Sequence, residues 1–282
     1  MEAAFFDLDK TVIAKASMVA FGGTFRRAGF INRRLLLRAA WSGLIFHHLG
    51  ADDARMHRFR ESALRITKGW DQARISAVVH EALTDVIGPI VYDEAIDEMD
   101  RHRSEGRRIY LVSASPTEIV EPLGVYLGVD ESIASRARVD AAGRYTGEVE
   151  LYAYGPFKAQ VVREVAARDG IDLSRSWAYS DSVTDIPLLE AVGHAVAVNP
   201  DRALAREART RGWELRTFRR GVPLRERVPV RGPGRVALVV TVALAASAGT
   251  LAGWLLSGRG RTARPRGERW AGSDQLRRPA AS

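Results

Sequence analysis

Cysteine is absent from this chain of 282 residues, and lysine is nearly so, because only four of its 42 basic residues are lysines. Without cysteine the chain can form neither disulfides nor thiolate metal sites, which fits a reducing compartment. Its six histidines show no metal-ligand spacing. No glycine-rich phosphate loop, internal repeat or nucleic-acid-binding motif occurs.

The formal net charge of +8 is distributed unevenly along the chain. Residues 1–200 carry 24 Lys and Arg against 28 Asp and Glu, whereas residues 201–282 carry 18 against six. The basic character thus belongs to the C-terminal part, and we expect no nucleic-acid partner for the rest. The length and the hydrophobic fraction of 46% suit one α/β domain with an insertion.

An acidic motif follows the first apolar run of the chain. Asp7 and Asp9 flank Leu8 directly after residues 3–6, which predicts a strand that ends in two carboxylates. Alternate residues of an extended segment share one face. One carboxylate can then attack phosphorus while its neighbour transfers a proton, as phosphoryl transfer through an aspartyl-phosphate requires. Taken alone, the motif also matches a solvated turn.

A second predicted strand, residues 109–112, leads to Ser113. Ser115, Pro116 and Glu118 then supply an N-cap, a first-turn proline and a capping-box acid for a helix. Ser113 would lie beside the N-terminus of that helix, where free N–H groups bind anions. The alternative is that Ser113 and Ser115 are only structural caps.

Two further segments supply a cation and two acids. Lys158 opens a predicted helix over residues 157–168, and its compact ammonium suits holding a carboxylate and a phosphate together. The predicted strand that starts at residue 177 ends in Asp181, with Asp185 four residues later. Oxygen sites with two or three carboxylates suit Mg²⁺. The structural alternatives are a surface lysine, a turn acid and a helix-start acid.

In this order and separation, the segments 7–11 and 181–185, with Ser113 and Lys158 between them, resemble the four motifs of the haloacid dehalogenase superfamily, subfamily IB, which is phosphoserine-phosphatase-like. The likeness covers about residues 1–215. It implies a doubly wound, Rossmann-like α/β fold whose site lies at the carboxyl ends of parallel strands. It also implies a helical cap between the first two motifs and a Mg²⁺-dependent phosphomonoester hydrolase.

The resemblance assigns a role to each matching acid. Asp7 would be the nucleophile and a Mg²⁺ ligand. Asp9 would be the general acid and base, with its backbone carbonyl on the metal. Asp181 would complete the metal ligands, and Asp185 would support the metal and the lysine.

The same resemblance implies a phosphate-binding group and a substrate. Ser113, Lys158 and the backbone N–H groups of Leu8 and Ala114 would bind the phosphate of a small ester. Phosphoserine phosphatases carry a glutamate for the substrate's amino group where this chain has Ala16.

A second position also departs from the phosphoserine-specific pattern. Those enzymes have asparagine before the last aspartate, where this chain has Thr184. Glu61 is a candidate replacement for the missing glutamate, or else a solvated helix residue. The chemistry is therefore expected to be intact, and the ester stays open.

The longest uncharged apolar run lies near the C-terminus. Residues 236–256 would span about 31 Å as a helix, close to the ~30 Å of a hydrocarbon core. We expect a single membrane-spanning helix here, with a core helix of the globular domain as the alternative. Arginines flank both ends, so the positive-inside rule gives no orientation. A cytoplasmic catalytic domain is the simplest topology, since the first strand leaves no room for a signal peptide.

Helical stretches between the first two motifs predict the cap. One, residues 32–49, has an apolar face wide enough for ordinary packing or for contact with a membrane surface. A second begins after Asp52 or Asp53, and a third follows Asp71 and closes near Gly88. We therefore expect a core formed by residues 1–14 and 89–220, with a helical cap at residues 15–88. A linker at residues 221–235, a transmembrane helix at residues 236–256 and a basic disordered tail at residues 257–282 would follow.

Further core elements are expected from periodicity and turn residues. They are a helix over residues 92–105 that ends at Gly106, a hairpin over residues 138–151 and a helix over residues 186–191. A last strand over residues 195–198 and a final helix, capped by Asn199 and Pro200 and ended by Gly212, follow.

Three functions remain open. The first is a phosphatase for a small ester, and the second is a phosphatase for membrane-associated or lipid phosphates, with the cap admitting substrate from the bilayer. The third is a non-catalytic membrane-tethered adaptor. An adaptor would be expected to lose at least one of the motif acids or the lysine, and this chain retains them all.

Overall fold

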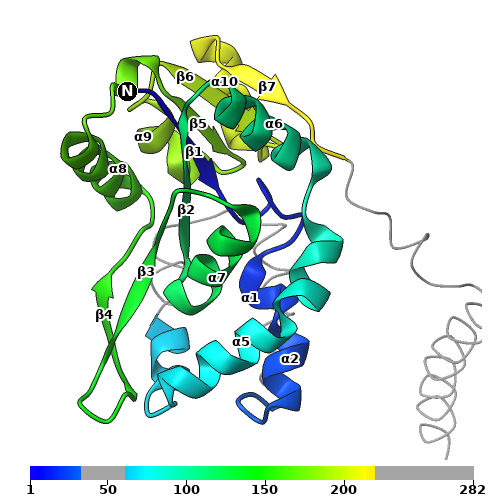
Figure 1. Ribbon diagram of the computed structural model, residues 1–282, viewed down its shortest axis with the longest axis vertical. Coiled ribbons are helices and arrows are strands. Elements are labelled where there is room, and N and C mark those ends of the chain that lie inside the picture. The colour runs from blue at the N-terminus through cyan, green and yellow to red at the C-terminus, as the bar shows by residue number, and fades with distance from the viewer. Residues whose placement is uncertain (33–60, 220–282) are drawn as a thin grey trace, which may run out of the picture. The chain divides into compact units, whose positions relative to one another are not determined.

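The computed structural model describes residues 1–32 and 61–219, all within one compact unit, Met1–Arg225. Its centre is a seven-stranded sheet in the order β4-β3-β2-β1-β5-β6-β7. Helices cover both faces of this sheet (Figure 1). The expectation of an α/β fold is thus confirmed.

The inner strands of the sheet run in parallel. β1 (Ala3–Asp7) pairs with β2 (Arg108–Pro116) on one side and with β5 (Trp177–Ser180) on the other. β3 (Glu131–Val139) extends the sheet beyond β2, and β6 (His194–Val198) extends it beyond β5. The chain therefore winds outward from β1 in both directions, as in a doubly wound fold, and the carboxyl ends of β1, β2 and β5 meet at the switch point.

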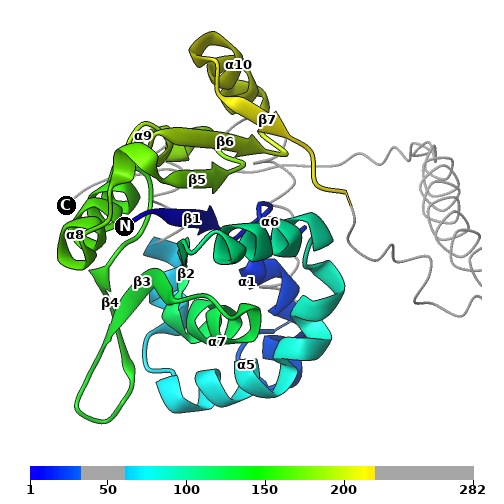
Figure 2. The same ribbon diagram turned by 45° about the horizontal axis from the view of Figure 1, so that its top comes forward.

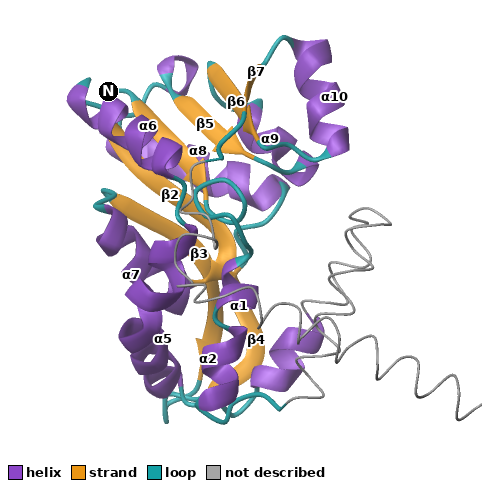
Figure 3. Cartoon of the chain, turned by 90° about the vertical axis from the view of Figure 1, so that its right-hand side faces the viewer, coloured by secondary structure: helices purple, strands orange, loops and turns teal. Residues whose placement is uncertain are grey.

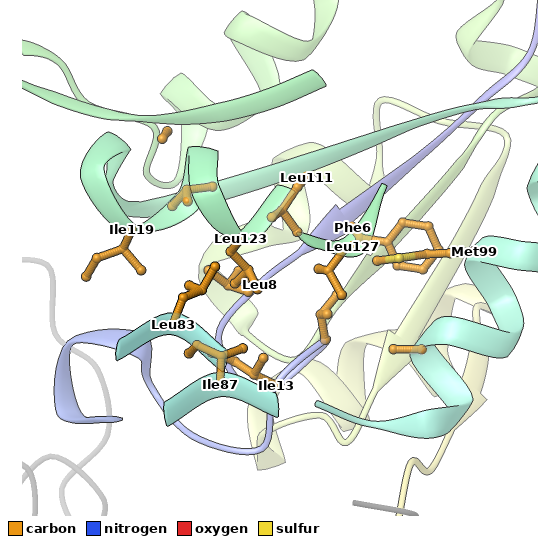
Figure 4. Packing of buried hydrophobic residues seen from close by; sticks show 14 of the residues in the cluster. Phe6, Leu8, Ile13, Leu83, Ile87, Met99, Leu111, Ile119, Leu123 and Leu127 are labelled. Carbon is orange, nitrogen blue, oxygen red and sulfur yellow. The ribbon is translucent and has the colours of Figure 1, made fainter. Parts of the chain in front are cut away.

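Side chains of β1 alternate between two buried clusters. Ala4 and Phe6 pack with one cluster and Ala3 and Phe5 with the other, as the two-residue period of a strand requires. The first cluster includes residues of α5 (Gln72–Ile87), α6 (Asp93–Ser104) and α7 (Thr117–Leu127) and is drawn in Figure 4. The second includes residues of α8 (Pro156–Asp169), α9 (Ile186–Leu189) and α10 (Arg202–Arg211). Figure 2 shows these two groups of helices on opposite faces of the sheet.

The expected hairpin is present, and it contacts the cap. β4 (Tyr145–Leu151) runs antiparallel to β3, and the Asp140 carboxylate accepts hydrogen bonds from backbone N–H groups within the turn. Beyond the turn, Tyr145 N–H donates to Trp70 O at 3.0 Å, and Gln72 N–H donates to Gly143 O at 3.0 Å. Figure 3 shows the hairpin extending along the side of the molecule that holds α5. The hairpin thus fixes the start of α5.

The described residues between β1 and β2 are largely helical. They contain α1 (Ser17–Ala20), α2 (Gly22–Arg27), helical residues 61–67 and α5, followed by the short 3₁₀ helix η1 (Gly88–Ile90). Asp71 caps α5, since its carboxylate accepts from Arg74 N–H at 2.9 Å. The helix expected over 32–49 and the cap at Asp52 or Asp53 lie outside the described residues.

The predicted linker, transmembrane helix and tail, residues 221–235, 236–256 and 257–282, also lie outside the described residues. Within residues 1–32 and 61–219, no helix has the length and apolar character needed to cross a bilayer. The spanning segment therefore stays a prediction from the sequence.

Three expectations about core elements were wrong. Residues 195–198 are not the last strand, because β7 (Glu214–Arg216) follows and pairs with β6. This three-residue edge strand alternates charged and apolar side chains too briefly to give a periodic signal. The helix after Asp185 ends at Leu189 instead of 191.

The cap of the final helix also differs from the expectation. Asp201, and not Asn199, caps α10, and its carboxylate accepts from Leu204 N–H at 2.8 Å. Asn199 instead takes a left-handed conformation with φ of 44°. Its side chain exchanges hydrogen bonds with the backbone of Phe218, which holds the chain after β7 against the sheet.

Candidate active site

The carboxyl ends of three neighbouring strands bring the predicted site residues together. Asp7 is the last residue of β1, Ser113 lies in the final part of β2, and Asp181 directly follows β5. Lys158 comes from the first turn of α8, and Asp185 ends the short 3₁₀ helix η3 (Val183–Asp185). All five residues are buried. Residues that are up to 178 positions apart in the chain thus meet at one edge of the sheet.

Lys158 joins two of the acids. Its Nζ lies 2.6 Å from Asp7 Oδ1 and 2.7 Å from Asp185 Oδ2. The Ser180 hydroxyl also donates to Asp185 Oδ2 at 2.7 Å, which fixes that carboxylate. Burial favours a neutral amine, but the adjacent carboxylates of Asp185 and Asp7 outweigh it and raise the pKa of Lys158 above its ordinary value. The site therefore contains a permanent cation.

The acids Asp7 and Asp181 are poorly compensated. Burial raises the pKa of Asp7 more than the Lys158 ammonium lowers it. Burial also raises the pKa of Asp181, and the neighbouring Asp7 carboxylate adds to the effect. Thr11 Oγ1 donates to Asp7 Oδ2 at 3.2 Å, which leaves the other oxygen to Lys158. Burial thus disfavours the ionised forms of both acids, and a bound cation would stabilise them.

The donor set fits Mg²⁺ although its side chains alone form no complete cluster. Among the described residues, no group of three or more His, Cys, Asp or Glu side chains is arranged to hold a metal ion. Asp185 accepts a hydrogen bond from Lys158, and the Asp9 carboxylate accepts hydrogen bonds from two serines. Asp7 and Asp181 are the two poorly compensated acids, and the family resemblance adds the backbone carbonyl of Asp9 as a third oxygen donor. Mg²⁺ in proteins commonly uses one or two carboxylates and keeps several waters.

The Asp9 carboxylate is held by residues from two different elements. Ser17 N–H in α1 donates to Asp9 Oδ1 at 2.7 Å, and the Ser115 hydroxyl at the end of β2 donates to Asp9 Oδ2 at 2.9 Å. The two serine hydroxyls also lie 2.7 Å apart. Burial raises the pKa of Asp9, and the hydrogen bonds from the serines oppose that rise.

The capping box expected at Ser115 was wrong. β2 continues through Pro116, which becomes the N-cap of α7 without any side-chain cap bond. Glu118 is bonded by Gln72 Nε2 at 2.8 Å instead of returning to the helix start. Ser115 fails to cap because its hydroxyl is directed to Asp9.

Ser113, the predicted phosphate-binding serine, lies in β2 next to β1. Its hydroxyl oxygen is buried and accepts a hydrogen bond from Ser115 N–H at 3.1 Å. Because that bond uses a lone pair, the hydroxyl hydrogen points elsewhere and can be donated to an anion. Ala114 follows it in β2, so its backbone N–H belongs to the same strand end.

Three supporting hydroxyls were not identified from the sequence. Thr11 was recognised only as part of the first motif, and Ser17 and Ser180 were not singled out. Spacing offers a signal for Thr11 alone, since it lies four residues after Asp7 in a loop that turns around the Leu8 carbonyl. Ser17 reaches Asp9 only through the tertiary fold.

The positions that depart from the phosphoserine pattern lie close to the site in sequence. Ala16 is the N-cap of α1 and offers no side-chain hydrogen bond. Thr184 Oγ1 lies 3.0 Å from Ser182 Oγ, in the turn that carries Asp185. Glu61, the candidate substitute acid, is exposed on helical residues 61–67.

Comparison with known families and proteins gives consistent matches. The family model for haloacid dehalogenase-like hydrolase matches residues 4–190. The chain is 50% identical over 249 residues to an "Inhibition of morphological differentiation protein" of Streptomyces azureus, covering 88% of this chain and 90% of the relative.

Two relatives from Mycobacterium tuberculosis carry enzymatic names. One is a probable phosphatase, 47% identical over 246 residues, with 87% of this chain and 85% of the relative covered. The other is a phosphoserine phosphatase, 33% identical over 254 residues, with 89% and 79% covered. Among solved structures, a Bordetella pertussis protein of unknown function superposes with a TM-score of 0.64 at 30% identity, covering 76% of this chain and 97% of that one.

Proposed function

The chain belongs to the haloacid dehalogenase-like hydrolases, and from that premise we propose that it is a Mg²⁺-dependent phosphatase that hydrolyses a phosphate monoester through an aspartyl-phosphate on Asp7. The observation that carries the proposal is the buried Lys158, bonded to both Asp7 and Asp185 at the carboxyl ends of the strands. A structural ion pair would not require two further acids, Asp9 and Asp181, at the same edge of the sheet.

The first step forms the covalent intermediate. A carboxylate oxygen of Asp7 attacks phosphorus, and the bond between phosphorus and the ester oxygen breaks. Asp9 gives its proton to that oxygen, so the leaving group departs as an alcohol. Burial raises the pKa of Asp9, which is the direction that favours the protonated form required of an acid.

The second step restores the enzyme. Asp9, now a carboxylate, accepts a proton from water as the water oxygen bonds to phosphorus. The bond between phosphorus and Asp7 breaks, and inorganic phosphate leaves with Asp7 as a carboxylate again. Protons and charges therefore balance over the two steps, and no other co-reactant is needed.

Charge on the transferring group would be stabilised by the chain's own donors. Lys158, the Ser113 hydroxyl and the backbone N–H groups of Leu8 and Ala114 would bind its oxygens. Asp7, Asp181 and the Asp9 carbonyl would hold Mg²⁺, which supplies further positive charge beside the phosphate. Preorganised charge of this kind provides most of the catalysis in phosphoryl transfer.

We further propose that the substrate is a small phosphate ester whose recognition does not depend on an amino group. The relatives named phosphatase and phosphoserine phosphatase support the reaction class. Ala16, however, offers no charge to an ammonium at the start of α1. We also propose, from the sequence, that residues 236–256 anchor the protein in a membrane with the catalytic domain on the cytoplasmic side. Lipid phosphates are the alternative substrates.

A panel of phosphate monoesters, assayed with Mg²⁺ and with a chelator, tests the proposal. We expect release of inorganic phosphate from at least one ester, dependent on Mg²⁺. Lipid phosphates in the panel separate the two substrate classes. A pure, folded protein that hydrolyses none of them in Mg²⁺ would favour the non-catalytic adaptor.

A further inference from the structure

The hydroxyls of Ser17 and Ser115 form a continuous hydrogen-bonded chain to the candidate acid and base. Ser115 Oγ donates to Asp9 Oδ2 at 2.9 Å, so the contact of 2.7 Å between the two serine oxygens is completed by the hydrogen of Ser17. Ser17 Oγ is also 3.4 Å from Asp9 Oδ2, a longer contact than the other two. Both serines are buried, at 0% and 6% exposed.

Neither serine is explained by local structure. Ser115 was the expected cap of α7, but Pro116 is the N-cap and Ser115 bonds to Asp9. Ser17 begins α1, whose N-cap Ala16 makes no side-chain bond, and its N–H is satisfied by Asp9 instead. The Asp9 carboxyl thus receives donors on both of its oxygens, from the first helix after the motif and from the end of the neighbouring strand.

The hydrogen-bond network also extends to Ser113, the serine expected to bind phosphate. Ser115 N–H donates to Ser113 Oγ at 3.1 Å, so one residue contacts both the acid and the serine expected to bind phosphate. A shift of Ser115 would therefore move the two together. General acid catalysis needs the proton within hydrogen-bond reach of the leaving oxygen, and a carboxyl free to rotate spends less time there.

Resting on the proposed phosphatase function, we propose that Ser17 and Ser115 are positioning residues that hold the Asp9 carboxyl in the orientation required to protonate the leaving group. Neither serine touches the transferring phosphate in this role. Their effect should depend on how much the leaving group needs a proton, which a purely structural role would not produce.

The test compares two esters with Ser17→Ala and Ser115→Ala in the full chain. An alkyl ester such as glycerol phosphate needs its leaving oxygen protonated, whereas p-nitrophenyl phosphate releases a stable phenolate. The ratio kcat/KM covers the steps up to the release of the alcohol, so it isolates the acid step from later hydrolysis. We expect Ser115→Ala to lower kcat/KM for the alkyl ester at least about 10-fold and for the aryl ester no more than about 3-fold.

Ser17→Ala should act in the same direction but less strongly, because alanine keeps the backbone N–H that bonds Asp9. The double variant should lose less than the product of the two single losses, since the hydroxyls act in one network. Ser174→Ala is the matched control, because its exposed hydroxyl bonds Asp172 Oδ1 at 2.6 Å away from the site. That variant should leave kcat/KM unchanged for both esters.

The outcomes separate this proposal from the one on which it rests. If kcat/KM falls equally for both esters in both serine variants, or falls for neither ester, the positioning role is wrong and the phosphatase function is unaffected. If Ser115→Ala does not fold, the test rests on Ser17→Ala, for which the loss of kcat/KM on the alkyl ester is compared with the loss on the aryl ester. A wild-type protein that hydrolyses neither these esters nor any in the panel would overturn the phosphatase, and the positioning role with it.

Discussion

At the scale of single residues, the central assignment is Asp7 as the nucleophile. Replacing it with asparagine preserves the shape of the side chain but removes the oxygen anion that attacks phosphorus. We expect Asp7→Asn to lower kcat at least about 10³-fold while the far-UV circular dichroism spectrum is retained. Asp85→Asn, on the exposed face of α5, is the matched control and should stay active. An Asp7→Asn protein with wild-type turnover would disprove the mechanism.

Substrate choice is also decided at the residue scale, by Ala16. A glutamate there would bind an ammonium with a charge-assisted hydrogen bond of about 1.5–3 kcal/mol, or roughly 10- to 150-fold in discrimination. The wild-type protein should therefore prefer phosphoserine by less than about 10-fold over a matched ester without the amino group. Ala16→Glu should raise that preference about 10-fold, measured as a ratio of kcat/KM values. A wild-type preference above about 100-fold would show that another acid, such as Glu61, meets the ammonium.

His102 makes a prediction about stability and pH. Burial, then the nearby Arg101 and Arg107, lower its pKa from 6.5 to about 4. Arg107 Nη1 lies 3.2 Å from Nδ1 of the ring, and Arg101 Nη2 lies 3.3 Å from Nε2, which is also 2.7 Å from Tyr179 Oη. A second ring proton would face the guanidinium N–H. The folded protein therefore holds His102 neutral.

The sign follows from which state binds the proton first. Between pH 6.5 and pH 4 the unfolded chain is protonated at His102 and the folded chain is not, so stability falls as pH falls through this window. The loss attributable to His102 should reach about 2 kcal/mol at pH 5 relative to pH 7, measured by urea unfolding. His102→Gln should reduce this difference whatever its own stability. His80→Gln, on the exposed face of α5, should keep it.

At the scale of secondary structure, sequence patterns succeeded where the signal is local. The helix after Asp71, the helix ended by Gly106 and the hairpin over 138–151 all have strong caps, turns or alternation, and all are present. The strands that carry Asp7, Ser113 and Asp181 at or near their ends and the helix start that carries Lys158 are also present as predicted.

The failures at Ser115, Asn199 and Ser17 share one physical cause, which is competition from tertiary contacts. Ser115 has a good local cap sequence, but the Asp9 carboxylate is a better partner for its hydroxyl. Asn199 could cap α10, yet its side chain bonds the Phe218 backbone, and Asp201 caps the helix. Ser17 was not recognised at all, because its partners become neighbours only after folding. The sequence therefore predicts the motif acids better than the side chains that orient them.

Two glycines test how closely the elements pack. A Cβ added at Gly193, just before β6, would lie 1.7 Å from the backbone oxygen of Ser174, so Gly193→Ala must push η2 (Leu173–Arg175) away. We expect a loss of about 2–3 kcal/mol in the free energy of unfolding. At Gly23 in α2 the nearest atom is 3.9 Å away, and Gly23→Ala should be neutral or stabilise by about 0.5–1 kcal/mol. Equal urea midpoints for both variants would contradict the described packing around Gly193.

At the scale of the whole molecule, charge and chemistry are separated along the chain. The acids and the lysine of the site all precede residue 186, whereas the net positive charge lies after residue 200. The described residues lie within one compact unit and contain two hydrophobic clusters and all the candidate site residues. The candidate active site is thus assembled from residues that precede the basic C-terminal part.

This separation predicts the result of removing residues 233–282, which include the apolar run 236–256. If that run is a membrane span, the shortened protein should leave the membrane fraction and keep kcat/KM for small phosphate esters within about 2-fold, because the deletion touches no site residue. Fractionation followed by assay of both forms measures this, with Asp7→Asn in the shortened protein as the inactive control. If the shortened protein does not fold, the apolar run belongs to the globular core, and the predicted anchor is wrong. If lipid phosphates lose turnover selectively on truncation while small esters do not, membrane proximity contributes to substrate choice.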